Sequence, residues 1–203
     1  MKKINKGASP GFFELWKINN PNTIYSDLER MNKPLRNKLR LHLAKEQGDI
    51  CCYCCCRLIP GKLHTEHIKP QTQFQNDTMD YTNMLASCNG YEVTDDTCGH
   101  RKNKWYSNGF VSPLDADCES RFEYTLQGRI KGKDADAQET VDNLNLSVFQ
   151  LNRARQKIIS LVLHEIDIDQ RHKQELLRHY RNKDANGQYQ PFSPAAVYAI
   201  QHL

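Results

Sequence analysis

The sequence predicts an α+β fold that is mainly helical, with a short cysteine-rich core between two helical regions. Three observations predict it. Apolar residues recur at helical spacing on both sides of the centre of the chain. Seven of the eight cysteines and three of the eight histidines lie within residues 51–105. Short alternating runs bounded by turn residues mark a few strands. We therefore divide the chain into residues 1–50, 51–106 and 107–203.

Residues 1–50 are predicted to form a basic helical scaffold. Ser9-Pro10 favours the start of a helix that ends near Asn20-Pro21. A short helix is expected over residues 24–31, followed by an amphipathic helix from Leu35 that Gln47-Gly48 ends. Ten Lys and Arg stand against five Asp and Glu in this region. We expect these helices to pack on the core and to offer basic side chains to its surroundings.

Residues 107–203 are predicted to form a β-hairpin followed by helices. The run 121–126 alternates polar and apolar residues, and Gln127-Gly128 joins it to 129–131, which is typical of a hairpin. Helical periodicity extends from about 138 to 180, and residues 143–147 are expected to divide it into two helices. Ser193-Pro194 favours the start of a last short helix.

Composition excludes several classes of protein. The chain has 203 residues, of which 38% are hydrophobic, and no apolar run reaches the roughly 18–20 residues of a membrane span. Its mean hydropathy of −0.75 describes a polar but foldable protein. The basic N-terminus lacks the apolar region of a signal peptide, so we expect a cytoplasmic protein with reduced thiols. The net charge of +4 is a mild basic bias.

The cysteines of the core predict a structural zinc site. Cys51 and Cys54 form a C-x-x-C pair, a spacing that lets two thiolates bind one tetrahedral Zn²⁺, and Cys88 and Cys98 supply the second pair. The register is open, because Cys52 and Cys55 have the same spacing. Cys118 stands apart and is interpreted as a small apolar residue.

Within the core, Leu58-Ile59 and Leu63–Thr65 are predicted to be two short strands joined by a turn at Pro60-Gly61. His67 would fall late in this hairpin. Residues 80–85 bring the chain back towards the second cysteine pair, and residues 98–102 form a basic helical segment. A hairpin followed by a helix would make a small cradle for one hard metal ion and one water.

The polar residues of the core suit phosphodiester hydrolysis. His67 offers an imidazole base for the attacking water, because its pKa lies near working pH. Glu66 and His100 offer ligands for a divalent ion that neutralises charge on the phosphorane. Three basic residues are expected to contact the phosphate backbone: Arg101, Lys102 and Lys104. A zinc held by four cysteines is closed, so two different metals are implied.

The order C-x-Y-C, E-H-I-x-P, D-Y-x-N-M-L-x-x-C and C-G-H-R-K resembles the HNH endonuclease family, whose site is the ββα-metal fold. The resemblance implies one catalytic Mg²⁺ or Mn²⁺ and a His base held by a backbone carbonyl. It makes His67 the first H of the motif, Asn83 the N that braces the loop behind the base, and His100 the last H. It also makes Glu66 a metal ligand.

Two features depart from that family. Nine residues separate Cys88 from Cys98, and Gly99 follows, where the usual pattern is C-x-x-C followed by Asn. The last metal ligand is therefore open among three residues, of which we favour the first: His100, Asn89 and Asn103. The acid before the base is Glu where Asp is common.

The start MKKINKG and the later NLNLSVFQLNRARQKII further resemble the HNH effectors (PtuB-like) of bacterial retron and Septu anti-phage systems. That resemblance implies an ABC-type ATPase partner, with a retron reverse transcriptase and its msDNA as further partners. It implies a nuclease held inactive until infection. The C-terminal helical region and the N-terminal helices would then be docking surfaces. DNA is the favoured substrate, and RNA such as tRNA stays open.

The alternative is a non-catalytic zinc module that binds nucleic acid or protein. A finger with Cys51, Cys54, His64 and His67 has an H-x-x-H pair that is tighter than the usual spacing. It also gives Cys88 and Cys98 no role and does not need the sequence E-H-I-x-P, so we favour the nuclease. His64 is then expected to be an exposed strand residue or a phosphate neighbour. Five histidines on predicted helices are assigned no role: 42, 164, 172, 179 and 202.

Overall fold

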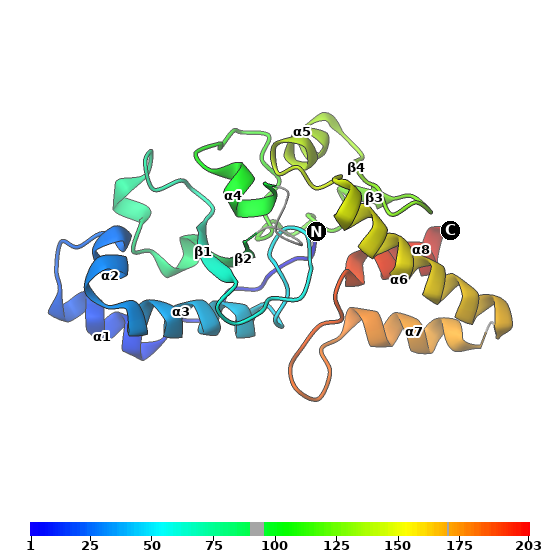
Figure 1. The fold of residues 1–203 in the computed structure, drawn as a ribbon, viewed down its shortest axis with the longest axis horizontal. Coiled ribbons are helices and arrows are strands. Elements are labelled where there is room, and N and C mark those ends of the chain that lie inside the picture. The colour runs from blue at the N-terminus through cyan, green and yellow to red at the C-terminus, as the bar shows by residue number, and fades with distance from the viewer. Residues whose placement is uncertain (90–95, 170) are drawn as a thin grey trace.

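A computed structural model of the chain describes residues 1–89, 96–169 and 171–203. It confirms the α+β class: the described residues form eight α-helices and two small antiparallel sheets (Figure 1). None of the described helices combines the length and the apolar character needed to cross a membrane. The helices and strands follow one another as α1 (Gly11–Asn19), α2 (Tyr25–Met31), α3 (Lys33–Glu46), β1 (Leu63–His67), η1 (Gln75–Asp77), η2 (Tyr81–Asn83), β2 (Met84–Cys88), α4 (Cys98–Lys102), β3 (Phe122–Tyr124), β4 (Ile130–Gly132), α5 (Ala135–Asn143), α6 (Phe149–Ile168), α7 (His172–Arg181) and α8 (Ser193–His202).

The N-terminal helices form where the sequence predicts them. Asn32 begins α3, because its side-chain oxygen accepts a hydrogen bond from the backbone N–H of Leu35 at 3.0 Å, and Pro34 fits the first turn. Leu39 and Leu43 lie one turn apart and are fully buried. Through this apolar stripe α3 packs on both strands of the first sheet.

The strand pairing in the core differs from the prediction. β1 pairs with β2 in antiparallel register, from Leu63 opposite Cys88 to His67 opposite Met84. The predicted hairpin of residues 58–59 with 63–65 is wrong, since Arg57 bridges to Ile50 and Ile59 is exposed. The pairing places Cys88 at one end of the sheet and His67 at the other.

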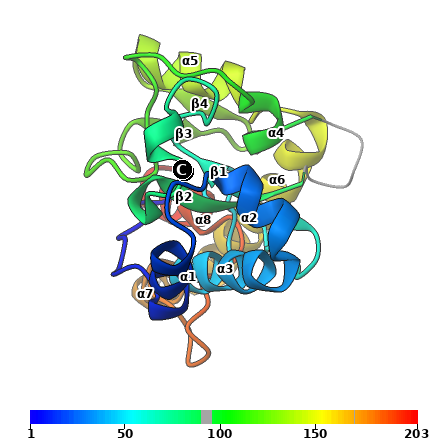
Figure 2. The same cartoon turned by 90° about the vertical axis from the view of Figure 1, so that its left-hand side faces the viewer.

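The first sheet lies between two helices. α4, which is helical as predicted, packs on β2 from one side, and α3 packs from the other (Figure 2). Gln47 at the end of α3 also holds the edge of β2. Its side chain donates to the carbonyl of Ala86 at 2.9 Å and accepts from the N–H of Ala86 at 2.6 Å. Each face of the first sheet therefore has its own helical neighbour.

The C-terminal region contains the predicted hairpin, formed by β3 and β4. Gly128 turns with a φ of +76°, and a Cβ there would collide with the carbonyl oxygen of Asn152. Arg155 is fully buried and donates to the carbonyls of Gly128 and Leu146, which fastens the hairpin turn to α6. The stretch predicted as two helices is three. The second break follows Asp169, whose carboxylate accepts from the N–H of Arg171 at 2.9 Å.

The loop before α8 returns to the cysteine-rich segment. The N–H of Phe192 donates to the carbonyl of Cys55 at 2.8 Å. Arg57 donates to the carbonyl of Tyr189 at 2.6 Å, and the N–H of Tyr189 bonds to the carbonyl of Gly48 at 3.0 Å. The C-terminal region therefore supports the segment that carries Cys51 and Cys54.

Candidate active site and metal centre

Four cysteines converge beside the first sheet. The sulfur atoms of Cys51, Cys54, Cys88 and Cys98 all lie within 4.8 Å of one another, and all four residues are buried. Cys51 and Cys54 come from the turn after α3, Cys88 ends β2, and Cys98 begins α4. Of the two registers, the structure brings Cys51 and Cys54 into this group. Cys55 instead points its sulfur at the carbonyl of Tyr53, 4.0 Å away.

The geometry of this group fits a tetrahedral zinc. The sulfurs of Cys54 and Cys88 are 3.8 Å apart. Two ligands about 2.3 Å from a tetrahedral Zn²⁺ lie about 3.8 Å from each other. Burial opposes ionisation of Cys51, but hydrogen bonds from neighbouring thiols outweigh it and hold its pKa well below that of a free cysteine. The N–H of Cys88 also points at the sulfur of Cys51, 3.4 Å away. The group excludes the finger that uses His64 and His67, because Cys88 and Cys98 complete the set.

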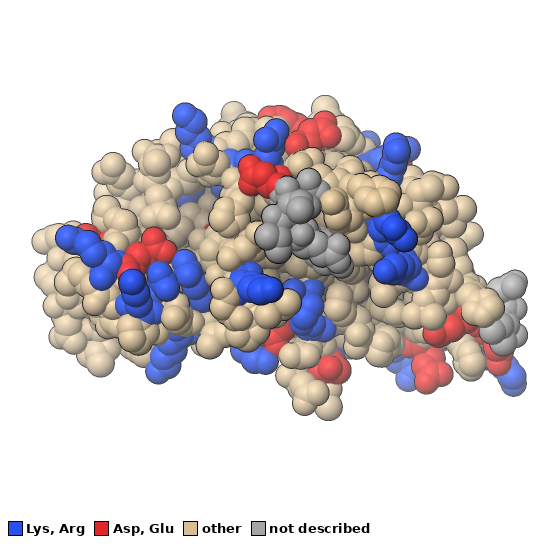
Figure 3. Space-filling model, viewed as in Figure 1, with Lys and Arg blue, Asp and Glu red and all other residues tan. Residues whose placement is uncertain are grey.

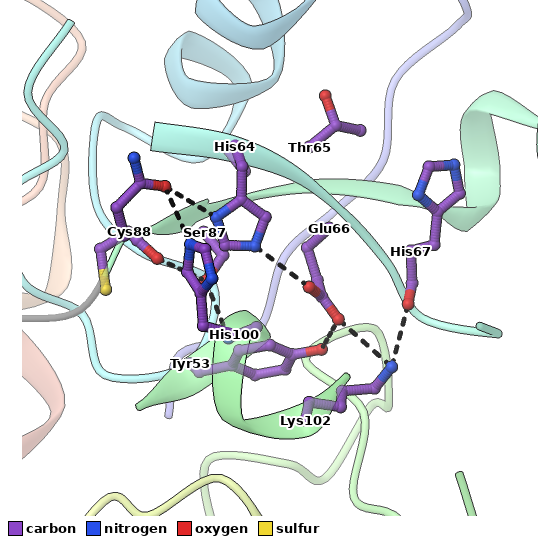
Figure 4. Close-up of polar contacts among 12 residues, drawn as sticks. Tyr53, His64, Thr65, Glu66, His67, Ser87, Cys88, His100 and Lys102 are labelled. Atoms are coloured by element: carbon purple, nitrogen blue, oxygen red, sulfur yellow. Dashed lines mark hydrogen bonds and ion pairs between the residues drawn. The ribbon is translucent and has the colours of Figure 1, made fainter. Parts of the chain in front are cut away.

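Glu66 projects from β1 towards α4 (Figure 4). Its Oε1 accepts from the hydroxyl of Tyr53 at 3.0 Å and from Nζ of Lys102 at 3.2 Å. Burial alone would raise the pKa of Glu66. The hydrogen bond to His64 and the charge of Lys102 outweigh burial and lower the pKa, so Glu66 is a carboxylate at neutral pH. Its second oxygen, Oε2, faces His64.

Lys102 does not lie where the sequence suggests. We expected it to contact a phosphate backbone, but its side chain is fully buried and its Nζ donates to the carbonyl of His67 at 3.0 Å as well as pairing with Glu66. A turn of α4 directs it into the core, while Arg101 on the same helix is exposed. Lys102 therefore holds the carboxylate of Glu66 and is not exposed to contact a phosphate backbone. Lys104 remains exposed, as expected.

His64 lies at the site, although we expected it to be only an exposed strand residue or a phosphate neighbour. It shares a face of β1 with Glu66, two residues away, and its Nε2 lies 3.4 Å from Glu66 Oε2 (Figure 4). Its Nδ1 lies 3.0 Å from Oδ1 of Asn89. Burial opposes protonation of His64, but its hydrogen bond to Glu66 and the charge of that carboxylate outweigh burial and raise the pKa of His64, so the two side chains share a proton. A divalent cation bound between them would replace that proton.

His100 lies beside this pair. Its ring packs edge to face on His64, with the ring centroids 4.6 Å apart. Its Nε2 lies 3.4 Å from the same Asn89 oxygen. Burial and the neighbouring His64 lower the pKa of His100, which favours the neutral, ligating form. Asn89 and His100 were both weighed as the last ligand, and the structure brings both to His64. Asn103, the third candidate, lines a cleft together with His64, Glu66 and His100.

Gly99 explains how α4 approaches so closely. A Cβ at this position would collide with Oε2 of Glu66 and with the ring of His64. The backbone N–H of Gly99 also donates to the hydroxyl of Ser87 at 3.2 Å. The glycine that departs from the family pattern therefore leaves the room in which an ion between His64 and Glu66 would lie.

His67 lies at the end of β1 with its ring on the opposite side from Glu66 (Figure 4). Its Nε2 donates to the carbonyl of Thr78 at 3.0 Å, and its Nδ1 has no hydrogen-bond partner among the described residues. Tyr25 of α2 packs edge to face on the ring at 4.8 Å. Burial lowers the pKa of His67 below the usual value for histidine. The ring is thus a neutral imidazole with one nitrogen fixed by a carbonyl and a second, buried nitrogen that has no partner among the described residues.

Asn83 holds the loop behind His67. Its Oδ1 accepts from the N–H of Lys69 at 2.7 Å, and its Nδ2 donates to the carbonyls of Lys69 and Asp77 at 3.1 Å. Thr78, the partner of His67, follows Asp77 directly. Asn83 is buried and lies among backbone groups, so its place is that of a positioning residue.

One cleft of about 480 Å³ brings the polar groups together. His64, Glu66, His67 and His100 line it. The sequence did not assign three further residues of its wall, which come from α2 and α3: Tyr25, Glu29 and Arg40. The spacing of two between His64 and Glu66 was the available signal for His64, whereas only the packing of α2 and α3 on the sheet reveals the other three.

Two known proteins are similar to this chain. The chain is 27% identical over 160 residues to the "Retron Vc95 putative HNH endonuclease" of Vibrio cholerae serotype O1 biovar El Tor, covering 74% of this chain and 75% of that protein. It is also 27% identical over 143 residues to the "Retron Ec83 putative HNH endonuclease" of Escherichia coli, covering 66% of this chain and 51% of that protein. No family model matches the chain. The two similarities support an HNH endonuclease family.

Proposed function

We propose that this chain is a metal-dependent HNH endonuclease that hydrolyses phosphodiester bonds of nucleic acid. The observation that carries the proposal is the pairing, in one cleft, of a neutral His67 held by a carbonyl with a buried Glu66 carboxylate. A cleft with a base and a metal-binding carboxylate suits hydrolysis of a phosphate ester. The names of the two relatives support the same reaction.

Glu66 and His100 would hold a single Mg²⁺ or Mn²⁺, with His64 as a further ligand. When bound, such an ion neutralises charge on the phosphate and stabilises the leaving oxygen. Tyr53 and Lys102 both hold Oε1 of Glu66, which leaves Oε2 facing His64. Ligands that are fixed in this way by hydrogen bonds to neighbouring groups are typical of metal sites in proteins.

His67 would act as the general base. Its Nε2–H remains bonded to Thr78, and its Nδ1 removes a proton from the water that attacks phosphorus. Tyr25 and the loop held by Asn83 keep the ring in place. The exposed side chains of Arg101 and Lys104 would contact the backbone of the substrate.

We further propose a role in anti-phage defence, in a retron or Septu system. The retron names of both relatives support it. The nuclease would then work in the cytoplasm with an ABC-type ATPase, a reverse transcriptase and its msDNA. The C-terminal helical region, residues 107–203, would serve as a docking surface. DNA is the favoured substrate, and structured RNA such as tRNA is the second.

Incubation of the zinc-loaded protein with labelled DNA and with total RNA, in Mg²⁺ or Mn²⁺, tests the proposal. The reaction is run with and without the ATPase. Wild type should cleave one of the two substrates, and H67A should not. Leaving out both Mg²⁺ and Mn²⁺ should stop cleavage while the zinc stays bound. Absence of cleavage under every condition, or equal cleavage by H67A, would refute the nuclease.

A further inference from the structure

The cleft that holds His67 and Glu66 continues into a second groove through one residue, Arg40. The groove has a volume of about 310 Å³, and Arg40 lines both hollows. On one side lies α3, with Arg36, Asn37, Arg40 and Leu41, and on the other the segment before β1, with Pro60, Gly61 and Leu63. No role has been given above to this groove.

The groove is basic because of its position on α3. This helix carries five Lys and Arg and one acid, Glu46. None of the groove's lining residues is acidic. Figure 3 shows Lys and Arg side chains spread over the α2 and α3 end of the molecule. A surface of this kind attracts a polyanion at short range.

The cations on the other side of α3 already have partners. Lys45 pairs with Asp49 at 2.6 Å, and the ammonium group of Lys38 lies 4.3 Å from the ring centroid of Phe12. Arg36 differs. Its guanidinium contacts the amide oxygen of the adjacent Asn37, and in the part of the chain that the structure describes it has no carboxylate partner.

Arg40 lies at the junction with donors to spare. Its Nη2 pairs with Oε1 of Glu29 at 2.9 Å, and the side chain of Arg40 is 19% exposed. Its Nε is buried and has no hydrogen-bond partner among the described residues. A guanidinium presents five N–H donors in a planar fork that matches two oxygens of a phosphate. Glu29 is 40% exposed, so solvent weakens the ion pair that a phosphate would replace.

We propose that this groove binds the sugar–phosphate backbone of the strand being cut. Arg40 contacts a phosphate next to the scissile one, and Arg36 contacts a phosphate further along the strand. The assignment of the neighbouring cleft as the place of cleavage rests on the proposed function. The two arginines are four residues apart on one helix, so their Cβ atoms lie about 6 Å from each other. With a rise of about 3.4 Å per nucleotide, they meet phosphates one or two nucleotides apart.

The substrate is accordingly a continuous strand and not a mononucleotide. A strand that reaches across α3 gains contacts that a dinucleotide lacks. The binding site also includes the N-terminal helices, which the motif of residues 51–105 does not cover. Leu41 and Pro60 are the exposed apolar residues of the lining, so the groove offers little surface for an apolar protein partner.

Binding without cleavage tests this groove. We would use the zinc-loaded H67A protein and follow the fluorescence anisotropy of labelled single-stranded DNA, duplex DNA and RNA oligonucleotides. In that background, R36A/R40A removes both groove cations. K38A/K45A is the matched control, because it removes the same charge from the same helix outside the groove.

We expect R36A/R40A to weaken binding of the preferred oligonucleotide at least 10-fold, and the control to change it less than 2-fold. The slope of log K against log salt should become shallower by about 1.4–1.8 in R36A/R40A, as expected for two lost phosphate contacts. R36A alone should weaken binding. It should also reduce the oligonucleotide length at which affinity stops increasing, because Arg36 contacts the more distant phosphate. The side-chain hydrogen bonds of Arg36 go to the adjacent Asn37 and tie no other part of the chain to α3. We therefore expect R36A to fold even if R40A does not.

Equal losses in the two double variants would overturn the proposal, because net charge would then explain both. Unchanged binding by R36A/R40A would overturn it as well. The result is separate from the nuclease test. A wild type that fails to cut any substrate, while R36A/R40A loses binding that K38A/K45A keeps, refutes the nuclease and supports the groove.

Discussion

Nζ of Lys102 lies 3.2 Å from Oε1 of Glu66, and both side chains are buried. This contact makes Lys102 part of the support for the carboxylate. It also explains why a lysine in a run of exposed basic residues is directed inwards. Three side chains converge on Glu66: those of Tyr53, Lys102 and His64.

Lys102→Ala should therefore destabilise the fold. Removing one partner of a buried ion pair leaves the other charge uncompensated, at a cost of about 3–5 kcal/mol. Urea unfolding measures the change. Lys104→Ala, at an exposed position nearby, should alter stability by less than about 0.5 kcal/mol. Equal stability of the two variants would show that Lys102 does not hold Glu66.

Cys88→Ser should remove the zinc. The sulfur of Cys88 lies 3.8 Å from that of Cys54 within the group of four, so its loss opens the tetrahedron. Elemental analysis of the purified protein gives the zinc content directly. Cys118→Ser is the control, because Cys118 is buried elsewhere and should leave one zinc per chain. Wild-type protein without zinc would contradict the structural role of the four cysteines.

His64→Ala should weaken binding of Mn²⁺ to the zinc-loaded protein by at least about 10-fold, since it removes the imidazole that faces Glu66. Asn89→Ala should weaken it less, because Asn89 orients His64. Calorimetric titration of Mn²⁺ measures both. Unchanged Mn²⁺ affinity in His64→Ala would remove this residue from the ligand set.

Activity should fall at acidic pH and be flat above neutrality. Burial lowers the pKa of His67, so the imidazole stays neutral until the pH drops below the usual histidine range. Protonation then removes the lone pair of Nδ1 that accepts the proton from water. A pH profile of kcat/KM locates the acid limb. An acid limb above the usual histidine pKa would contradict a buried, neutral base.

Much of the fold follows from sequence patterns. Leu39 and Leu43 lie one turn apart and so predict the buried face of α3. β2 has no such signal, since Met84–Cys88 is buried at every position and lacks the alternation of a half-exposed strand. Because β2 was not predicted as a strand, Leu58-Ile59 was predicted to pair with the residues of β1. The pairing of β1 with β2 depends on how the sheet packs against α3 on one face and α4 on the other, and these helices lie far apart in the sequence.

The site divides in the same way. The C-x-x-C spacing and the need of zinc for four ligands predicted a site with Cys88 and Cys98, but left the register of the first pair open. The fold resolves it, because Cys51 and Cys54 join this group while Cys55 points its sulfur elsewhere. The burial of Lys102 was not predictable, since its neighbours in the sequence are polar and only the rotation of α4 turns it inwards. Arg40 is 26 residues from Glu66 in the sequence, and only the packing of α3 against β1 brings it to the cleft.

Cleavage of labelled nucleic acid by wild type and by H67A, with the zinc content and the melting temperature of both measured in parallel, tests the central claim most directly. We predict that wild type cleaves in Mn²⁺, and that H67A binds the same substrate, keeps its zinc and does not cleave. Cleavage by H67A at the wild-type rate, with the same metal dependence, would contradict the assignment of His67 as the base.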